Sequence, residues 1–376
     1  MPSNYRHLGI FSDWVEEARA FATKRQRTLF PTAKPGPQTY EQLLAVMGFH
    51  QQPETAPDAR VERTWQDDGI QGEVWSWSVG YGPRTEAYVM KPQNAAGPLP
   101  AVIALHDHGG FKWFGKEKIA NGPDGMADPI LEPYFRDYYG DRAWVNALVK
   151  EGFVVLVHDT FLWGSRKFSW EIVSEQTALD HPNQVHTIEE YNQAAANHEH
   201  VVEKYCNLLG TTLAGVVSHE DRIALNVLLS REDVDKDRVA CMGLSGGGNR
   251  ACLLTATHDG LAAAVVVGLM STYEGLLDHN VSTHTWMLFP SGWSQYGDWP
   301  DIAASRAPRP LLVQYDNEDD LFTPEGMHAA DEKLQQHYAS VGAAQAYTGQ
   351  FYPGPHKFDL EMQENAFSWL KKVLKI

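Results

Sequence analysis

Strand-like apolar segments that alternate with helix-like segments constrain the fold of this 376-residue chain more than any other feature. Strands buried on both faces are nearly continuous in Val, Ile and Leu, whereas strands with one wet face alternate apolar and polar residues. The strand-like segments after Pro98 read PAVIALHDHGG, GFVVLVHDT, RVACMGLS, AAAVVVGLM, RPLLVQYDN and AQAYTGQFYPG. Helix-like segments lie among them, at 136–151, 223–232, 247–260, 324–340 and 360–375. This succession predicts a mostly parallel central sheet with helices on both faces.

The chain before Pro98 is organised differently. Residues 61–90 alternate apolar and polar positions with turn residues between them, which predicts three antiparallel strands. Residues 12–29 have helical periodicity behind a Ser N-cap, and the following PTAKPGPQ interrupts the chain. We therefore expect an N-terminal helical extension, residues 1–60, followed by one large domain, residues 61–376.

Two long segments interrupt the predicted alternation, at about 160–218 and 271–300. Each follows the carboxyl end of a predicted parallel strand, which is where α/β proteins bind their ligands. Loops of this length in a compact domain usually carry function, as covers or binding loops. We expect both insertions to shape a ligand site.

The charge balance and the cysteines bear on partners and compartment. The chain has 48 acidic and 31 basic residues, a net charge of −17, and this excess repels phosphate backbones and anionic lipids. Nucleic acid and membrane partners are therefore not expected. The chain has no run of ~18 apolar residues and no signal-like N-terminus, so we expect a cytoplasmic protein. Cys206, Cys241 and Cys252 lack paired spacing and are expected to be small buried hydrophobes.

Ser245 is the candidate nucleophile. It stands in the G-x-S-x-G pattern GLSGG, between a predicted strand and a predicted helix. A serine at such a turn has a strained backbone, and Gly243 and Gly247 supply the near side-chain-free neighbours that this strain requires. The amide of Gly246 then faces the place where an oxyanion develops. The competing interpretations are a plain tight turn and a phosphate-binding loop, and the second lacks the lysine of that motif.

A serine hydroxyl needs a base, and the base needs an acid that holds its tautomer. His356 is the last histidine of the chain and follows the final predicted strand in a Gly/Pro loop, YPGPHKFD, so it is the candidate base. The segment DNEDDLFTP follows the strand before it and offers the candidate acids. These are Asp316, Glu318, Asp319 and Asp320.

The segment HDHGGFKW, residues 106–113, is placed to supply the second oxyanion donor, through the amide of Gly110 or Phe111. A metal site is the rival interpretation of the same segment. His106 and His108 stand two apart on an extended stretch and therefore point to one side. Further ligands for such a site are only loosely placed, in NHEH at 197–200, and we expect no metal.

Several ordered pieces give the chain a family resemblance. They read LHDHGG, DTFLWGSR, GLSGGG, PRPLLVQYDNEDDLFTP and GPHKF. The chain resembles the α/β-hydrolase superfamily over about residues 60–376, specifically bacterial serine esterases similar to dienelactone hydrolases and acetyl xylan esterases. The resemblance implies an acid four residues before a proline, so Pro324 selects Asp320, with the adjacent Asp319 as the alternative. It also implies that Gly246 and Gly110 contribute oxyanion amides.

The chain departs from the smallest dienelactone hydrolases, because its nucleophile is serine where those enzymes use cysteine. The extension and the insertions are typical of larger esterases with covered pockets. The tryptophans that we expect in the cover are Trp163, Trp170, Trp286 and Trp293. Trp163 and Trp286 are the candidates for substrate contact. For each of the four, plain packing is the alternative. Asp159 and Arg166 of DTFLWGSR are expected to brace the loop that they occupy.

The sequence predicts a carboxylic ester hydrolase that acts through an acyl-enzyme on a small-molecule ester, with acetylated substrates and lactones as candidate classes. Ser245, His356 and Asp320 form the predicted triad, and no metal or organic cofactor is required. The alternatives are an amidase or peptidase with the same triad and a non-catalytic binding protein on a hydrolase fold. A homo-oligomer formed through the N-terminal extension is a further expectation.

Overall fold

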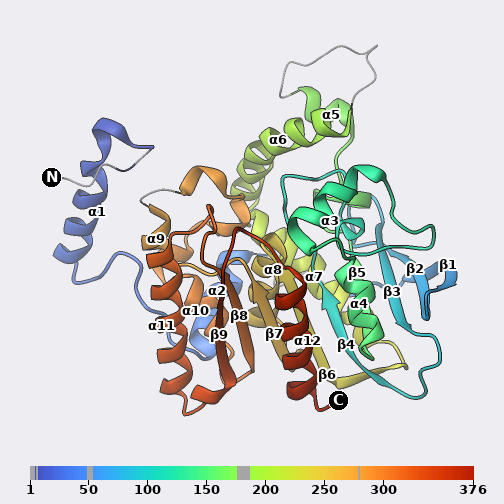
Figure 1. Cartoon of the computed structure of the whole chain (residues 1–376). Helices are drawn as coiled ribbons and strands as arrows, with labels where there is room; N and C mark the ends of the chain where they lie inside the picture. The colour runs from blue at the N-terminus through green and yellow to red at the C-terminus, as the bar shows by residue number, and fades with distance from the viewer. Residues whose placement is uncertain (1–4, 6, 49–53, 176–186, 278–279) are drawn as a thin grey trace.

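A nine-stranded sheet lies at the centre of the computed structural model, which describes residues 5, 7–48, 54–175, 187–277 and 280–376 (Figure 1). The strand order is β1-β2-β3-β5-β4-β6-β7-β8-β9. The strands are β1 (Arg60–Asp67), β2 (Ile70–Trp77), β3 (Thr85–Pro92), β4 (Leu99–Ala104), β5 (Val154–His158), β6 (Val234–Leu244), β7 (Ala263–Val267), β8 (Leu311–Asp316) and β9 (Tyr347–Tyr352).

Strand direction divides the sheet as the sequence predicts. β1, β2 and β3 pair antiparallel with one another, and β3 pairs antiparallel with β5. From β5 across to β9 every neighbouring pair is parallel. The carboxyl ends of β4, β6 and β8 therefore point to one edge, and the loops that follow these strands meet there.

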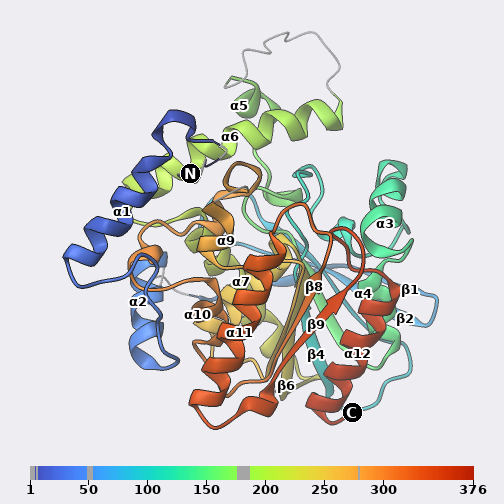
Figure 2. The ribbon, with the colours of Figure 1, turned by 60° about the vertical axis from the view of Figure 1, so that its left-hand side comes forward.

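Helices cover both faces of the sheet (Figures 1 and 2). The helices are α1 (Asp13–Lys24), α2 (Pro37–Met47), α3 (Glu132–Tyr139), α4 (Trp144–Lys150), α5 (Trp170–Glu175), α6 (Ile188–Leu208), α7 (Leu213–Leu229), α8 (Gly246–Thr257), α9 (Tyr273–Leu277), α10 (Trp299–Ala304), α11 (Pro324–Ser340) and α12 (Leu360–Leu374). None of the helices within the described ranges combines the length and the apolar character that a membrane span requires.

Two hydrophobic cores lie on opposite faces of the sheet. Along β4, Ala101 and Ile103 belong to the core that contains α7 and α8, while Val102 and Ala104 belong to the core that contains α4 and α12. Because neighbouring strand residues point to opposite faces, an unbroken apolar run serves both cores at once. Cys206, Cys241 and Cys252 are buried and carry free thiols, as expected from the sequence.

The structure corrects three expected helices. The helix expected at 223–232 is α7, which begins ten residues earlier, at Leu213, and ends at Leu229. The helix expected at 136–151 is two helices, because α3 ends at Tyr139 and the following Gly140 has a left-handed backbone with φ 62°. The helix expected at 12–29 ends at Lys24, and the break that follows it leads into α2, which begins at Pro37. The division into an extension and a domain, and an oligomer formed through the extension, stay predictions.

Candidate active site

Ser245 occupies the sharp turn between β6 and α8. Its φ of 57° and ψ of −119° lie outside the regions that side-chain-bearing residues prefer, so the turn is strained. A Cβ on Gly243 would come within 2.5 Å of the Leu105 carbonyl oxygen, and one on Gly247 within 2.1 Å of the same atom. Both positions therefore require glycine, and the predicted strand–turn–helix is present. The Ser245 amide donates to Val267 of β7 at 2.8 Å, which anchors the turn to the sheet.

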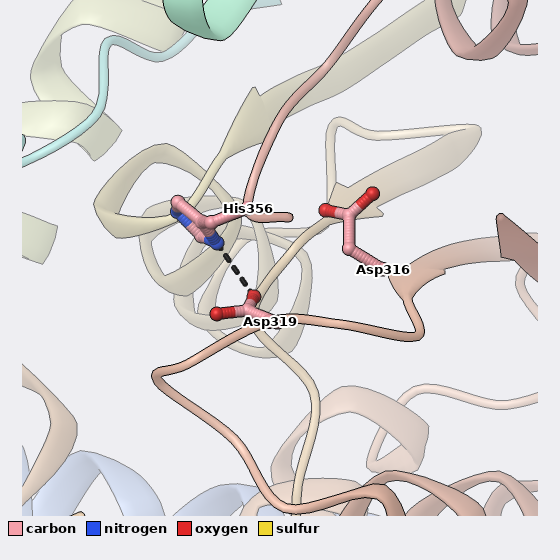
Figure 3. A group of neighbouring side chains, drawn as sticks. All are labelled: Asp316, Asp319 and His356. Carbon is pink, nitrogen blue, oxygen red and sulfur yellow. Dashed lines mark hydrogen bonds and ion pairs between the residues drawn. The ribbon is translucent and has the colours of Figure 1, made fainter. Parts of the chain in front are cut away.

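His356 lies in the loop between β9 and α12 and is paired with Asp319, which follows β8. Nδ1 of His356 lies 2.6 Å from Oδ2 of Asp319 (Figure 3). The second carboxylate oxygen of Asp319 accepts a hydrogen bond from the Leu321 amide at 2.8 Å, so the carboxylate is held from both sides. With Nδ1–H donated to Asp319, Nε2 of His356 carries the lone pair. Nε2 is buried and has no hydrogen-bond partner within the described ranges.

The prediction that Asp320 pairs with His356 is wrong. Asp320 is exposed, and its carbonyl oxygen accepts a hydrogen bond from Asn280 at 2.9 Å. The chain turns directly after β8, where the Asp319 amide donates to the Asp316 carbonyl at 3.2 Å. This turn directs Asp319 inward, and spacing counted from a proline cannot decide which of two adjacent aspartates faces the histidine.

Asp316, the last residue of β8, is a second carboxyl group beside the pair (Figure 3). Its Oδ2 accepts from the Lys357 amide at 3.1 Å, while its Oδ1 is buried without a partner in the described part of the chain. Burial raises the pKa of Asp316 to about 7. Potential ligand atoms of Asp316, Asp319 and His356 lie within 4.8 Å of one another, the spacing that a metal ion would need.

The pKa of His356 is raised above its usual 6.5. Burial works in the opposite direction, but the hydrogen bond and the charge of Asp319 outweigh it, with smaller contributions from Asp316 and Asp107. A carboxylate that stabilises an imidazolium is what a histidine needs in order to accept a proton from a hydroxyl.

A cavity of about 240 Å³ brings Ser245 and His356 onto one surface. It is smaller than the ~300–1,000 Å³ of typical ligand pockets. The wall combines apolar side chains with hydroxyl and imidazole groups. Its other side chains include Leu244, Leu269, Leu288, Phe322, Tyr134, Tyr138, Asn249, His284 and Thr285.

Gly246 and Gly110, the expected oxyanion donors, both border this cavity. Gly246 is the first residue of α8, where helix amides point outward. The Gly110 amide, in contrast, already donates to Nδ1 of His108 at 3.0 Å, and the alternative amide, of Phe111, donates to the His108 carbonyl at 3.2 Å. A Cβ on Gly246 would lie 2.5 Å from the His108 backbone nitrogen. The His108 amide is therefore the loop donor adjacent to Gly246.

His106 and His108, the two histidines that could share a metal ion, bind different neighbours. Nδ1 of His106 lies 3.0 Å from the Asp107 carbonyl oxygen, and burial holds the pKa of His106 well below its usual value. Nε2 of His108 lies 3.0 Å from a carboxylate oxygen of Glu199 on α6. Glu199 of the NHEH segment is therefore bound to the His108 loop.

Neither tryptophan proposed for substrate contact is among the residues that line the cavity. Trp163 is 1% exposed and packs edge-on against the His108 ring, with 5.2 Å between the ring centroids. Trp286 is half-buried, and its indole N–H donates to His200 at 2.8 Å. Both rings thus pack against histidines, and the expectation that they contact substrate stays a prediction.

His284 of the second insertion is a cavity residue that sequence reasoning missed. Its Nε2 lies 2.9 Å from the Leu321 carbonyl oxygen, and burial lowers its pKa to about 4, so the ring is neutral near pH 7. With Nε2–H donated to this carbonyl, Nδ1 is a hydrogen-bond acceptor. The surrounding NVSTHTW carries no motif that marks this histidine.

Asp159 and Arg166 brace their loop as predicted. Asp159 is fully buried and accepts hydrogen bonds from the amide and Nζ of Lys116 and from the Ser165 amide. Arg166 forms a buried ion pair with Glu220 of α7. Both residues fix the loop after β5 to neighbouring elements.

Known proteins resemble this chain in sequence and in fold. No family model matches it. The Bacillus subtilis (strain 168) protein named "Putative hydrolase YtaP" is 26% identical over 265 residues, which cover 70% of this chain and 75% of that protein.

Three solved structures share the fold. A Bacteroides fragilis protein described as a "putative acetyl xylan esterase" matches with a TM-score of 0.64 and 20% identity, over 84% of this chain and 74% of that one. Acetyl xylan esterase 1 from Thermoanaerobacterium sp. matches at 0.57 and 14%, over 92% and 96%. A glucuronoyl esterase from Solibacter usitatus matches at 0.57 and 14%, over 89% and 91%. With the observed strand order and the Ser245 turn, these matches establish that the chain has the α/β-hydrolase fold.

Proposed function

We propose that this protein is a serine carboxylic ester hydrolase that acts on small-molecule esters through an acyl-enzyme. One observation carries the proposal: a serine on a strained strand-to-helix turn and a histidine bonded to a buried carboxylate border the same cavity. The three residue types follow one another as Ser245, Asp319 and His356, the chain order of α/β hydrolases. The hydrolase and esterase names of the similar proteins agree with it.

In the proposed reaction, the Ser245 hydroxyl attacks the ester carbonyl while Nε2 of His356 takes its proton. Asp319 holds the imidazole and stabilises its positive charge. The amide of Gly246, together with the adjacent His108 amide, donates to the oxyanion, and each such donor contributes about 10²- to 10³-fold in rate. The leaving alcohol receives the proton from His356. Water, activated by the same nitrogen, then releases the acid, and no cofactor takes part.

The size of the cavity supports a short acyl group, such as acetyl. A cavity of about 240 Å³ fits a short acyl group better than a long acyl chain beside the alcohol. Hydroxyl and imidazole groups of the insertion, including neutral His284, support an alcohol portion that carries hydroxyl groups. The acetyl xylan esterase names of two neighbours are consistent with such a substrate.

A fluorophosphonate probe tests the nucleophile. We expect the wild type to be labelled and to hydrolyse acetyl esters, and Ser245→Ala to lose both labelling and turnover. Cys241, which is buried two residues before the turn's first glycine, offers a matched control, because Cys241→Ala changes the same strand without removing the hydroxyl. Labelling of Ser245→Ala equal to that of the wild type would exclude the proposal. A panel of acetyl, butyryl and octanoyl esters with matching anilides separates an esterase from an amidase.

A further inference from the structure

Glu199 on α6 is a buried carboxylate that joins three segments far apart in the sequence. One of its oxygens accepts from Nε2 of His108 at 3.0 Å and from Nζ of Lys112. The other accepts from Oγ1 of Thr285 at 2.6 Å and from the Trp286 amide at 2.9 Å. Both oxygens are thus fully engaged, the first by the loop after β4 and the second by the second insertion.

Both of these segments form walls of the cavity that contains Ser245. His108 and Gly110 of the first segment line it, as do His284, Thr285 and Leu288 of the second. Glu199 is 4% exposed and lies behind these walls, where it has no place in the cavity lining itself. A group in this position acts on substrate only through the residues that it holds.

The bond to Glu199 also sets the tautomer of His108. Because an ionised carboxylate only accepts hydrogen bonds, Nε2 of His108 carries the proton and Nδ1 carries a lone pair. That lone pair accepts the Gly110 amide at 3.0 Å, which closes the turn of residues 108–110. Burial opposes ionisation, but the charge of Lys112 and the hydrogen bonds from Lys112 and His108 hold the pKa of Glu199 well below its usual value, so the carboxylate stays ionised.

We propose that Glu199 is a positioning residue of this active site, which fixes the loop of residues 108–110 and the segment of residues 283–288 relative to Ser245. The inference rests on the proposed ester-hydrolase function. Through the His108 ring, Glu199 positions the His108 backbone amide beside Gly246. Through Thr285 it positions the cavity wall of residues 283–288. Its removal should disturb turnover without touching Ser245, His356 or Asp319.

Glu203, one helical turn further along α6, provides a matched control. It is 2% exposed and accepts hydrogen bonds from Asn207, from the Leu213 amide at 2.8 Å and from Ser291, but it does not contact the His108 loop. Glu199→Gln and Glu203→Gln each neutralise one buried carboxylate on the same helix. We expect both to lower the unfolding temperature and only Glu199→Gln to lower kcat on an acetyl ester, by about 10- to 100-fold, because small displacements of reacting groups have costs of this order.

Substitutions of His108 keep the inference testable if Glu199→Gln fails to fold. His108→Gln retains a donor near the ε position for Glu199, whereas His108→Asn retains only groups near the δ position. We expect His108→Gln to keep more of kcat than His108→Asn. We further expect the loss in the Glu199→Gln/His108→Asn double variant to be smaller than the product of the single losses.

Two results would overturn the role of Glu199: equal kcat values for Glu199→Gln and Glu203→Gln, or independent effects at Glu199 and His108. Failure of the proposed function has a separate signature, because Ser245→Ala would then retain wild-type turnover or probe labelling. The pH profile of kcat/KM provides a further check. Its acid limb should be unchanged in Glu199→Gln, since the pair of His356 and Asp319 remains intact.

Discussion

The turn that carries Ser245 and the cavity wall of residues 108–110 and 283–288 are held in place by different interactions. The turn depends on local backbone requirements, with glycines at positions 243 and 247 packed against a single carbonyl oxygen. The facing wall depends on side chains, because one carboxylate on α6 holds segments 91 and 86 residues away in the sequence. The first kind of construction leaves a short motif in the sequence, and the second leaves none. The same difference predicts how substitutions in the two regions will act.

The largest effect is expected on the acid side of the proposed triad. Asp319→Asn should lower kcat by about 10⁴-fold, because an amide in place of the carboxylate stabilises the wrong tautomer of His356. Asp320→Asn is the matched control, since it makes the same change one residue away on an exposed side chain, and it should leave kcat unchanged. Steady-state kinetics on an acetyl ester compares the two. A larger loss in Asp320→Asn would reverse the assignment.

A smaller effect is expected at His284 on the facing wall. His284→Phe removes the acceptor Nδ1 but keeps a ring, so KM for an acetyl ester of a sugar should rise by about 2- to 12-fold, the value of one hydrogen bond. KM for ethyl acetate, whose alcohol has no further hydroxyl group, should stay constant. Equal changes for both esters would show that the ring only packs.

The smallest effect is a pH shift at Asp316. His356 must be neutral to act as a base, so activity falls as the pH falls through its raised pKa. Asp316 adds to that rise when it is ionised, and Asp316→Asn should therefore move the acid limb of kcat/KM to lower pH by a fraction of a unit. The pH profiles of the wild type and the variant across neutral pH measure it. A limb that moves to higher pH would contradict this placement of the charge.

Local patterns were sufficient for most of the fold. Unbroken apolar runs identified β4 to β8, and the alternation between residues 61 and 90 identified the antiparallel strands. The segment 136–151 forms two helices because Gly140 has a left-handed backbone, which apolar periodicity does not reveal. The Ser245 turn could be predicted from the sequence because its glycines, strand and helix lie within one short segment.

The parts of the site that sequence reasoning missed depend on contacts between distant residues. Asp319 and Asp320 are adjacent and identical in type, so only the turn after β8 decides which one faces His356. Trp163 and Trp286, the predicted substrate-contact residues, pack against His108 and His200, and this packing too joins residues far apart in the sequence. Glu199 and His284 became recognisable only when the fold placed α6 and the second insertion beside the loop after β4.

The contact between the Ser245 turn and the Leu105 carbonyl has a consequence for how substrate specificity can change. Because no side chain fits between α8 and the end of β4, the nucleophile and the loop amide beside it form one rigid unit. The cavity wall of residues 283–288 is held by side chains instead, through Glu199 of α6 and Asn249 of α8. Side-chain contacts with Glu199 and His200 hold that segment on α6, so a substitution there changes the cavity wall without changing the backbone of the Ser245 turn. New substrate preferences can therefore evolve there while the chemical step is preserved.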